Sequence, residues 1–283
     1  MVKELPRKSV TDVCTKVWPL AQDPTHQFYP LFESEEDVRD TLSWTMEDDD
    51  ARAYGYWRER ALEGVCCLFI ENQQHYVLII ALYAWGNFKN VANAFLRRIL
   101  AEFPGYVIET GIAGEHTRFA AKLIRSGFAL QDDRFNMRRM LPAQIAQESL
   151  PDLELRVLER EVFKEYAPLH GEWFHDSITS AEDLEYCPEN RLIVTARREG
   201  RIIGAVFIQF FAHVGQICGL HAEDGLIARA LLIEAMQKSA MRLDVIEALE
   251  WVIQRNDPFL AVLYNLGFEQ TAHYTFYHRD VSE

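Results

Sequence analysis

Two landmarks of this sequence recur at the same spacing. A Gly-Phe pair follows an apolar helical segment at Gly127-Phe128, and another pair follows one at Gly267-Phe268. A glycine that opens an apolar strand stands at Gly64 and again at Gly204. The two intervals, from position 127 to 267 and from position 64 to 204, are equal. Each is as long as a whole domain and far exceeds a solenoid repeat of about 20–50 residues. The sequence therefore predicts two tandem copies of one domain.

The length and one polar segment indicate where the two copies divide. The chain has 283 residues, and at about 150 residues per domain this length favours two domains. The segment 142–151 is polar and has a proline at each end, which is typical of a linker. We predict an N-terminal domain over residues 1–143 and a C-terminal domain over residues 144–283. The copies either pack through their sheets or exchange their last strands.

Hydrophobic periodicity predicts the same order of elements in both halves. Apolar residues alternate or run together as in strands, and Leu226, Ala230 and Ile233 recur at helical spacing. Each half reads β-α-α-β-β-β-α-β-α-β. The predicted fold class is therefore α/β (an α+β mixed sheet), with an antiparallel meander followed by crossover helices. The expected strands are 52–57, 65–70, 76–83, 106–109 and 134–140 in the first half, and 153–158, 192–197, 202–211, 215–221, 249–253 and 274–278 in the second.

Charge and composition argue against several classes of protein. The formal net charge is −14 and no basic footprint appears, so we expect no nucleic-acid partner and a small amine as substrate. No apolar run approaches the roughly 18 residues of a membrane span, and no signal core follows the N-terminus. We expect a cytoplasmic monomer or homodimer without a membrane partner. The five cysteines form neither a disulfide framework nor a zinc motif, so no metal is expected.

The element order and three local patterns resemble the GNAT superfamily of acyl-CoA-dependent N-acyltransferases. The first pattern is a strand pair that turns and continues into a glycine, at 199–204. The second is a strand that enters a loop and then a helix with the small-apolar run 230–232. The third is Asn256, eleven residues before Gly267. The resemblance covers nearly the whole chain and implies two tandem GNAT-like domains with degenerate CoA loops.

This resemblance implies acetyl-CoA as cosubstrate, with its pyrophosphate at a helix N-terminus. Backbone N–H groups and the positive end of the helix dipole favour an anion there, and small residues let the backbone approach it. The family's loop positions fall on Glu223, Leu226 and Ala228 in the second copy, and only the last keeps the small residue. The implied cofactor-binding residues are Leu220, Ala222, Gly225, Leu226, Ile227, Ala228, Arg229 and Asn256 in the second copy, and Asn87, Phe88, Lys89, Asn90, Val91 and Ala92 in the first.

The two phosphate loops differ in charge. Glu223 and Asp224 bring two carboxylates to the second-copy loop. A pair of like charges at about 6 Å costs on the order of 3 kcal/mol at an effective dielectric near 20. The first-copy loop has no acid and contains Lys89. Electrostatics alone therefore favours the first copy as the phosphate site, whereas the catalytic candidates favour the second.

Three second-copy residues are candidates for catalysis. His221 ends the strand beside the expected thioester, where a histidine can act as base near neutral pH; a polar residue that simply ends a strand is the alternative. Many family members place a proton-donating Tyr four residues before the Gly-Phe pair. Leu263 stands there, and Tyr264 follows about 100° further around the helix. Glu250, like Glu109 in the first copy, lies in the fifth strand, from which the family often lines its substrate pocket; a solvated strand face is the alternative.

The leading hypothesis is an N-acetyltransferase that moves an acetyl group from acetyl-CoA to a small amine or amino-acid-like acceptor, with the second copy catalytic. The alternative is a non-catalytic GNAT-fold binding or scaffold protein that has lost acyl-CoA binding in one or both copies. A carboxylate of Glu223 or Asp224 in the phosphate cradle would favour this alternative, as would a closed cleft between the two middle strands. A third possibility is one bound CoA with a substrate cleft between the copies.

Overall fold

The computed structural model describes residues 1–141, 150–174, 190–211, 213–241 and 246–282. Most of the expected linker at 142–151 therefore lies outside the described residues. The chain divides into two compact units, of which unit 1 comprises Met1–Arg134 and His273–Glu283, and unit 2 comprises Phe135–Ala272. None of the helices in the described part of the chain combines the length and apolar character needed to cross a membrane.

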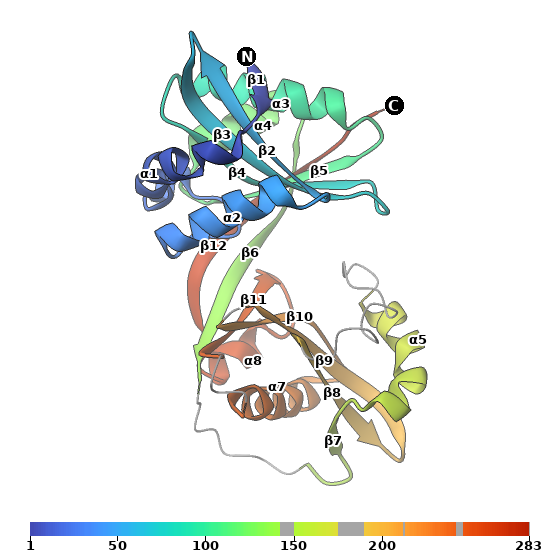
Figure 1. The fold of residues 1–283 in the computed structure, drawn as a ribbon. Helices are drawn as coiled ribbons and strands as arrows, with labels where there is room; N and C mark the ends of the chain where they lie inside the picture. The colour runs from blue at the N-terminus through green and yellow to red at the C-terminus, as the bar shows by residue number, and fades with distance from the viewer. Residues whose placement is uncertain (142–149, 175–189, 212, 242–245, 283) are drawn as a thin grey trace. The chain divides into compact units, whose positions relative to one another are not determined.

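Unit 1 is a mixed sheet with helices on both faces (Figure 1). Its strands lie in the order β1-β2-β3-β4-β5-β12, in which β4 and β5 are parallel and the other neighbouring pairs are antiparallel. The elements are β1 (Val2–Glu4), η1 (Arg7–Ser9), α1 (Val10–Ala21), η2 (Pro24–His26), α2 (Glu35–Glu47), β2 (Ala51–Arg58), β3 (Ala61–Glu71), β4 (Tyr76–Ala84), α3 (Phe88–Glu102), β5 (Val107–Ala113), α4 (Thr117–Arg125) and the start of β6 (Ala129–Met140).

Unit 2 repeats this arrangement, with strands in the order β6-β11-β10-β9-β8-β7. Here β10 and β11 are the parallel neighbours. The helix α7 packs against β8, β9 and β10. The elements are β7 (Glu154–Val157), η3 (Arg160–Val162), α5 (Phe163–Trp173), β8 (Arg191–Arg198), β9 (Arg201–Phe211), β10 (Val214–Ala222), α7 (Gly225–Ala240), β11 (Ala248–Gln254), α8 (Leu260–Asn265) and the start of β12 (Glu269–Asp280).

Corresponding elements keep the spacing that the sequence landmarks showed. β2 and β8, β3 and β9, and β6 and β12 are each separated, at both their first and their last residues, by the interval between Gly64 and Gly204. The glycines of the two Gly-Phe pairs both adopt positive φ, +82° at Gly127 and +76° at Gly267, which a glycine adopts without steric cost. The predicted tandem copies and the predicted fold class are therefore confirmed.

The first strand landmark is a glycine because the backbone of the next strand approaches it closely. A Cβ added at Gly64 would lie 2.7 Å from the carbonyl oxygen of Tyr83. A Cβ added at Gly204 would lie 2.8 Å from the carbonyl oxygen of His221. Neither backbone oxygen can move aside as a flexible side chain would. The repeated glycine is thus a requirement of sheet packing, repeated because the fold is repeated.

The last strand of each half completes the other unit's sheet. β12, the last strand of the chain, pairs with β5 along all of Val107–Ala113 in unit 1. In turn, β6 contributes its residues from Phe135 onward to unit 2. In this part of β6, Asn136 Nδ2 donates to Thr271 Oγ1 at 3.0 Å. Of the two arrangements that the sequence left open, the structure has the exchange of last strands.

We expect Gly204→Ala to lower the free energy of unfolding of unit 2 by about 1–3 kcal/mol, because the new methyl group overlaps a backbone oxygen. Gly171→Ala in α5 is the matched control, since no heavy atom lies within 4 Å of its added Cβ. This control should leave stability unchanged or raise it by up to about 1 kcal/mol. Urea unfolding of both variants measures the difference. A Gly204→Ala protein as stable as the wild type would contradict the close approach.

Candidate functional site

In each unit, two neighbouring parallel strands pair only at their starts. β4 pairs with β5 over three residues beginning at Tyr76↔Val107. β10 pairs with β11 over three residues beginning at Val214↔Ala248. A register shift in β4 and another in β10 follow these pairs, and such bulges bend a strand. The same separation of strands, here called the splay, thus occurs once in each copy.

The splay of unit 1 is filled by a segment from the loop after η2. Phe28 forms a bridge with Ile112 of β5. On either side of it, Tyr29 N donates to Gly111 O at 2.9 Å and Ala113 N donates to Gln27 O at 3.1 Å. β12 already occupies the opposite edge of β5, so the loop takes the edge that β4 leaves free.

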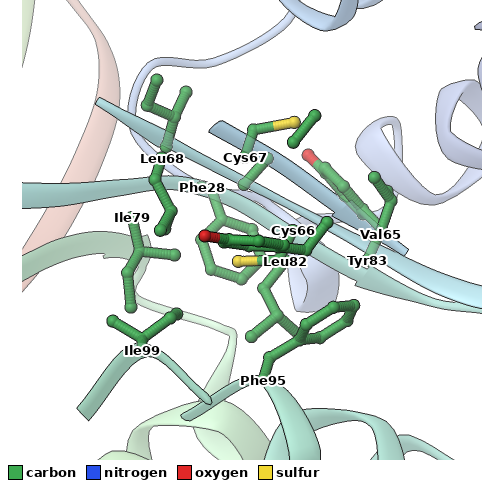
Figure 2. Packing of buried hydrophobic residues seen from close by; sticks show 14 of the residues in the cluster. Phe28, Val65, Cys66, Cys67, Leu68, Ile79, Leu82, Tyr83, Phe95 and Ile99 are labelled. Atoms are coloured by element: carbon green, nitrogen blue, oxygen red, sulfur yellow. The ribbon is translucent and has the colours of Figure 1, made fainter. Parts of the chain in front are cut away.

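The side chain of Phe28 closes this region. It is fully buried and its ring lies 5.5 Å from that of Tyr83 in β4. Figure 2 shows Phe28 among buried side chains of β3, β4 and α3. The end of β4, from Ile79 to Ala84, is buried at every residue. Unit 1 therefore leaves little room along this strand for a thioester.

His116 lies within the same packing. Its ring contacts Phe28, Phe88 and Phe119 at centroid distances of 5.3, 6.1 and 5.5 Å. It is 2% exposed, and neither ring nitrogen has a hydrogen-bond partner among the described residues. Burial lowers the pKa of His116 to about 3, so the ring is neutral at pH 7. By the spacing of the repeat, this residue is the counterpart of Asn256 in unit 1.

The splay of unit 2 is more open along its strand. Leu220, His221 and Ala222, at the end of β10, are all half-buried. The imidazole of His221 stacks on Trp173 with ring centroids 4.1 Å apart and planes 7° apart. Burial lowers the pKa of His221 below its ordinary value, although Glu172 and Glu223 act in the opposite direction. A neutral imidazole at an accessible strand end can accept a proton.

The N-terminus of α7 is capped by a carboxylate. Asp224 Oδ1 accepts from the backbone N–H groups of Leu226 and Ile227, both at 2.9 Å. These are first-turn donors of the kind that would hold a pyrophosphate. Glu223 points elsewhere, because its carboxylate pairs with Arg198 at 3.4 Å. In unit 2 the predicted phosphate cradle is therefore occupied by the carboxylate of Asp224.

The N-terminus of α3 is capped by a neutral side chain. Asn87 Oδ1 accepts from Asn90 N at 3.1 Å. Phe88 is half-buried beneath Arg118, whose Cζ lies 4.9 Å from the ring centroid, and Lys89 is exposed. The loop of unit 1 thus suits an anion better than the loop of unit 2, while its splay suits a thioester less well.

The remaining predicted cofactor residues divide by burial. Ile227, Ala228, Val91 and Ala92 are buried in their helices and pack in the cores. Gly225, Leu226 and Asn256 are exposed, and Arg229 is half-buried. The first group can reach a ligand only through the backbone, as can Gly225, whereas Leu226, Asn256 and Arg229 can reach it through their side chains.

Tyr264 and Glu250 have partners of their own. Tyr264 is 47% exposed, and its hydroxyl donates to Gln270 Oε1 at 3.4 Å. Leu263 is fully buried instead, so this position belongs to the core. Glu250 pairs with Arg138 at 3.2 Å. The catalytic roles assigned to Tyr264 and Glu250 stay predictions.

Sequence reasoning missed four residues that shape the two splays. Asp224 carries a charge that repels a phosphate, but an Asp before a helix is also a strong N-cap signal. His116 could have been found by subtracting the repeat length from Asn256. Phe28 and Trp173 gave no signal, because an aromatic residue in a loop or at the end of a helix does not reveal which strand it covers.

Comparison with solved structures identifies the fold. A GCN5-related N-acetyltransferase from Sphaerobacter thermophilus matches with a TM-score of 0.77 and 14% identity, over 100% of this chain and 96% of that one. A tandem GNAT protein from the clavulanic acid biosynthesis pathway matches with a TM-score of 0.67 and 12% identity, over 100% and 99%. A putative acetyltransferase from Pyrococcus horikoshii matches with a TM-score of 0.61 and 12% identity, over 100% and 91%.

These identities establish the fold and nothing finer. No protein-family model matches the sequence, and no curated protein matches it significantly. The predicted fold of two tandem GNAT-like domains is confirmed.

We expect the pKa of His221 to lie below about 6.5, the ordinary value for histidine, because the ring is covered on Trp173. Trp173→Ala uncovers the ring and should raise this pKa towards the ordinary value. Titration of the His221 ring protons by NMR measures both, and loss of the signal in His221→Gln assigns it. A wild-type value at or above about 6.5 would be incompatible with a covered imidazole.

We expect His116 to destabilise unit 1 in acid. The unfolded chain protonates this residue below about pH 6.5, whereas the folded unit keeps it neutral down to about pH 3. The free energy of unfolding therefore decreases as the pH is lowered between these two values. At about 1.4 kcal/mol per pH unit, the loss reaches about 2 kcal/mol at pH 5. His116→Phe removes this contribution. Urea unfolding at pH 7 and pH 5 tests it, and equal pH dependence in both proteins would refute it.

Proposed function

We propose that the chain is an acyl-CoA-dependent N-acyltransferase in which unit 2 holds the reacting groups. The proposed donor is acetyl-CoA, and the proposed acceptor is a small amine or amino-acid-like molecule. One observation carries the choice of unit: the strand end Leu220–Ala222 is half-exposed in unit 2, whereas the matching end of β4 is buried under Phe28 in unit 1. The net charge of −14 supports a cationic acceptor.

The residues of unit 2 fit an acyl-CoA at the strand and hinder it at the loop. Leu220 and Ala222 present a half-exposed strand end along which the thioester arm can lie. At the start of α7, a pyrophosphate would have to displace the Asp224 carboxylate from the N–H groups of Leu226 and Ile227. The bound cosubstrate supplies an activated acyl group. Binding of the pyrophosphate therefore requires the Asp224 carboxylate to give up its hydrogen bonds at the start of α7.

His221 is the proposed general base. Because its pKa is lowered, the ring is neutral at pH 7 and can take a proton from the attacking amine nitrogen. A new C–N bond forms at the acyl carbon as the C–S bond breaks. The proton on His221 is then available to the leaving thiolate. Tyr264 remains the proposed alternative donor, and Glu250 is proposed to attract the ammonium group of the acceptor.

A GNAT-fold binding protein without activity is the second candidate, and the Asp224 cap favours it. Occupied donors at the α7 N-terminus are what a copy that no longer binds acyl-CoA would keep. The cap stabilises the helix by about 1 kcal/mol, so it has a structural use of its own. The filled splay of unit 1 likewise favours a non-catalytic role for that copy.

We expect acetyl-CoA to raise the melting temperature of the protein, with a stabilisation of about 1.4–2.7 kcal/mol at tenfold to hundredfold excess over Kd. Asp224→Ser keeps an N-cap and removes the negative charge, so it should tighten binding by about tenfold or more. Asn87→Ser changes the equivalent cap of unit 1 and should leave Kd unchanged.

The outcomes of this titration separate the candidates. No shift at millimolar acetyl-CoA in the wild type or in Asp224→Ser would eliminate the enzyme and leave the binding protein. Binding by Asp224→Ser alone would mean that the native cap blocks the cosubstrate. A change in Kd confined to Asn87→Ser would move the site to unit 1.

A further inference from the structure

A groove beside α3 in unit 1 is lined by none of the residues that shape the two splays. Its volume is about 560 Å³, and it lies between α3 and the first two strands. It is lined by Met1, Val2 and Ala94 and by the polar side chains of Tyr56, Asn90, Asn93, Arg97 and Arg98. Small-molecule sites typically measure about 300–1,000 Å³. The groove is therefore large enough for a metabolite of modest size.

The helix presents these residues to the groove by its periodicity. Asn90, Ala94 and Arg98 are spaced four residues apart and share one face of α3. The residues of α3 that pack in the core, among them Phe95 and Ile99, lie on another face. Asn90, expected from the sequence to serve the phosphate loop, thus lends its side chain to this groove.

The lining is rich in donors and contains no carboxylate, although the chain has 43 acidic residues. Among the described residues, the side-chain amides of Asn90 and Asn93 and the hydroxyl of Tyr56 have no protein partner. Arg97 donates from Nε to the carbonyl oxygen of Asn93 at 3.3 Å and pairs with no described carboxylate. A groove with two guanidinium groups and no carboxylate favours an anion over a cation.

Arg98 is held in place by groups behind it. Its Nε lies 2.6 Å from Glu102 Oε2, and Glu102 Oε1 accepts a hydrogen bond from the Tyr54 hydroxyl at 2.6 Å. The guanidinium carbon stands 5.8 Å from the centroid of the Tyr54 ring, and Tyr54 is only 1% exposed. Such support fixes a guanidinium before any ligand arrives, which lowers the entropy cost of binding.

We propose that this groove binds a small hydroxylated oxyanion, a carboxylate or a phosphate ester. The guanidinium groups of Arg97 and Arg98 match the paired oxygens of either anion. The amides of Asn90 and Asn93 can donate to and accept from hydroxyl groups on the same molecule. Unit 1, whose splay is filled by Phe28, would then carry a ligand site of its own that is independent of acyl transfer.

The experiment titrates the full chain with citrate and, separately, with glucose 6-phosphate at physiological ionic strength, by calorimetry. We expect saturable binding of at least one probe, and the stronger of the two identifies carboxylate or phosphate as the preferred anion. Arg97→Gln should weaken that binding by about tenfold or more, since a charged hydrogen bond is lost. Arg125→Gln in α4 removes the same charge from an exposed residue outside the groove and should leave Kd nearly unchanged.

Both variants alter exposed side chains without a described carboxylate partner, so both should fold, which urea unfolding checks. Absence of saturable binding by both probes up to about 10 mM, where the binding free energy is below about 3 kcal/mol, overturns the proposal. Equal weakening by Arg97→Gln and Arg125→Gln also overturns it, because only a diffuse charge effect would then remain. Acetyl-CoA plays no part in these measurements, so their result stands apart from that of the proposed acyl transfer.

Discussion

The short parallel pairing in each copy is the constraint on which the rest depends. β4 and β5, like β10 and β11, share three residue pairs and then part. Backbone groups along the separated edges need other partners, since an unpaired buried N–H or C=O is costly. Unit 1 meets part of this need with the segment around Phe28, which pairs with the free edge of β5. The two copies satisfy this constraint differently: the splay of unit 1 is filled by the Phe28 segment, whereas the strand end at the splay of unit 2 is still accessible.

Packing and electrostatics favour different copies, and packing is the stronger argument. A like charge beside a phosphate costs on the order of 3 kcal/mol, and a cap that rotates away can relieve it. A fully buried aromatic ring is harder to displace: losing a buried Phe side chain typically costs about 3–5 kcal/mol. Phe28, buried against Tyr83, is such a ring. An acyl chain would therefore enter unit 2 by moving a surface carboxylate more readily than unit 1 by unpacking its core.

The repeat made the fold predictable, but not the contents of its two splays. Glycines such as Gly64 and Gly204 are dictated by backbone approach within a sheet, so their spacing reports the scaffold directly. Periodicity does not locate the helices of residues 1–50, although Ser34 and Asp37 form a capping box that marks the start of α2. The contacts of Phe28 and Trp173 could not be predicted, because they join segments distant in sequence and no local spacing encodes them.

The Asp224 cap shows how one residue can serve stability and restrain binding together. Its carboxylate satisfies two N–H groups that α7 would otherwise leave without intrahelical partners. Any phosphate that binds there must compensate for the loss of these bonds before it gains affinity. Asn87 at the start of α3 satisfies one N–H group and carries no charge, so it opposes an anion less. The copy with the accessible strand thus has the more restrictive helix N-terminus, and in the proposed acyltransferase the balance between the two would set how strongly an acyl-CoA is held.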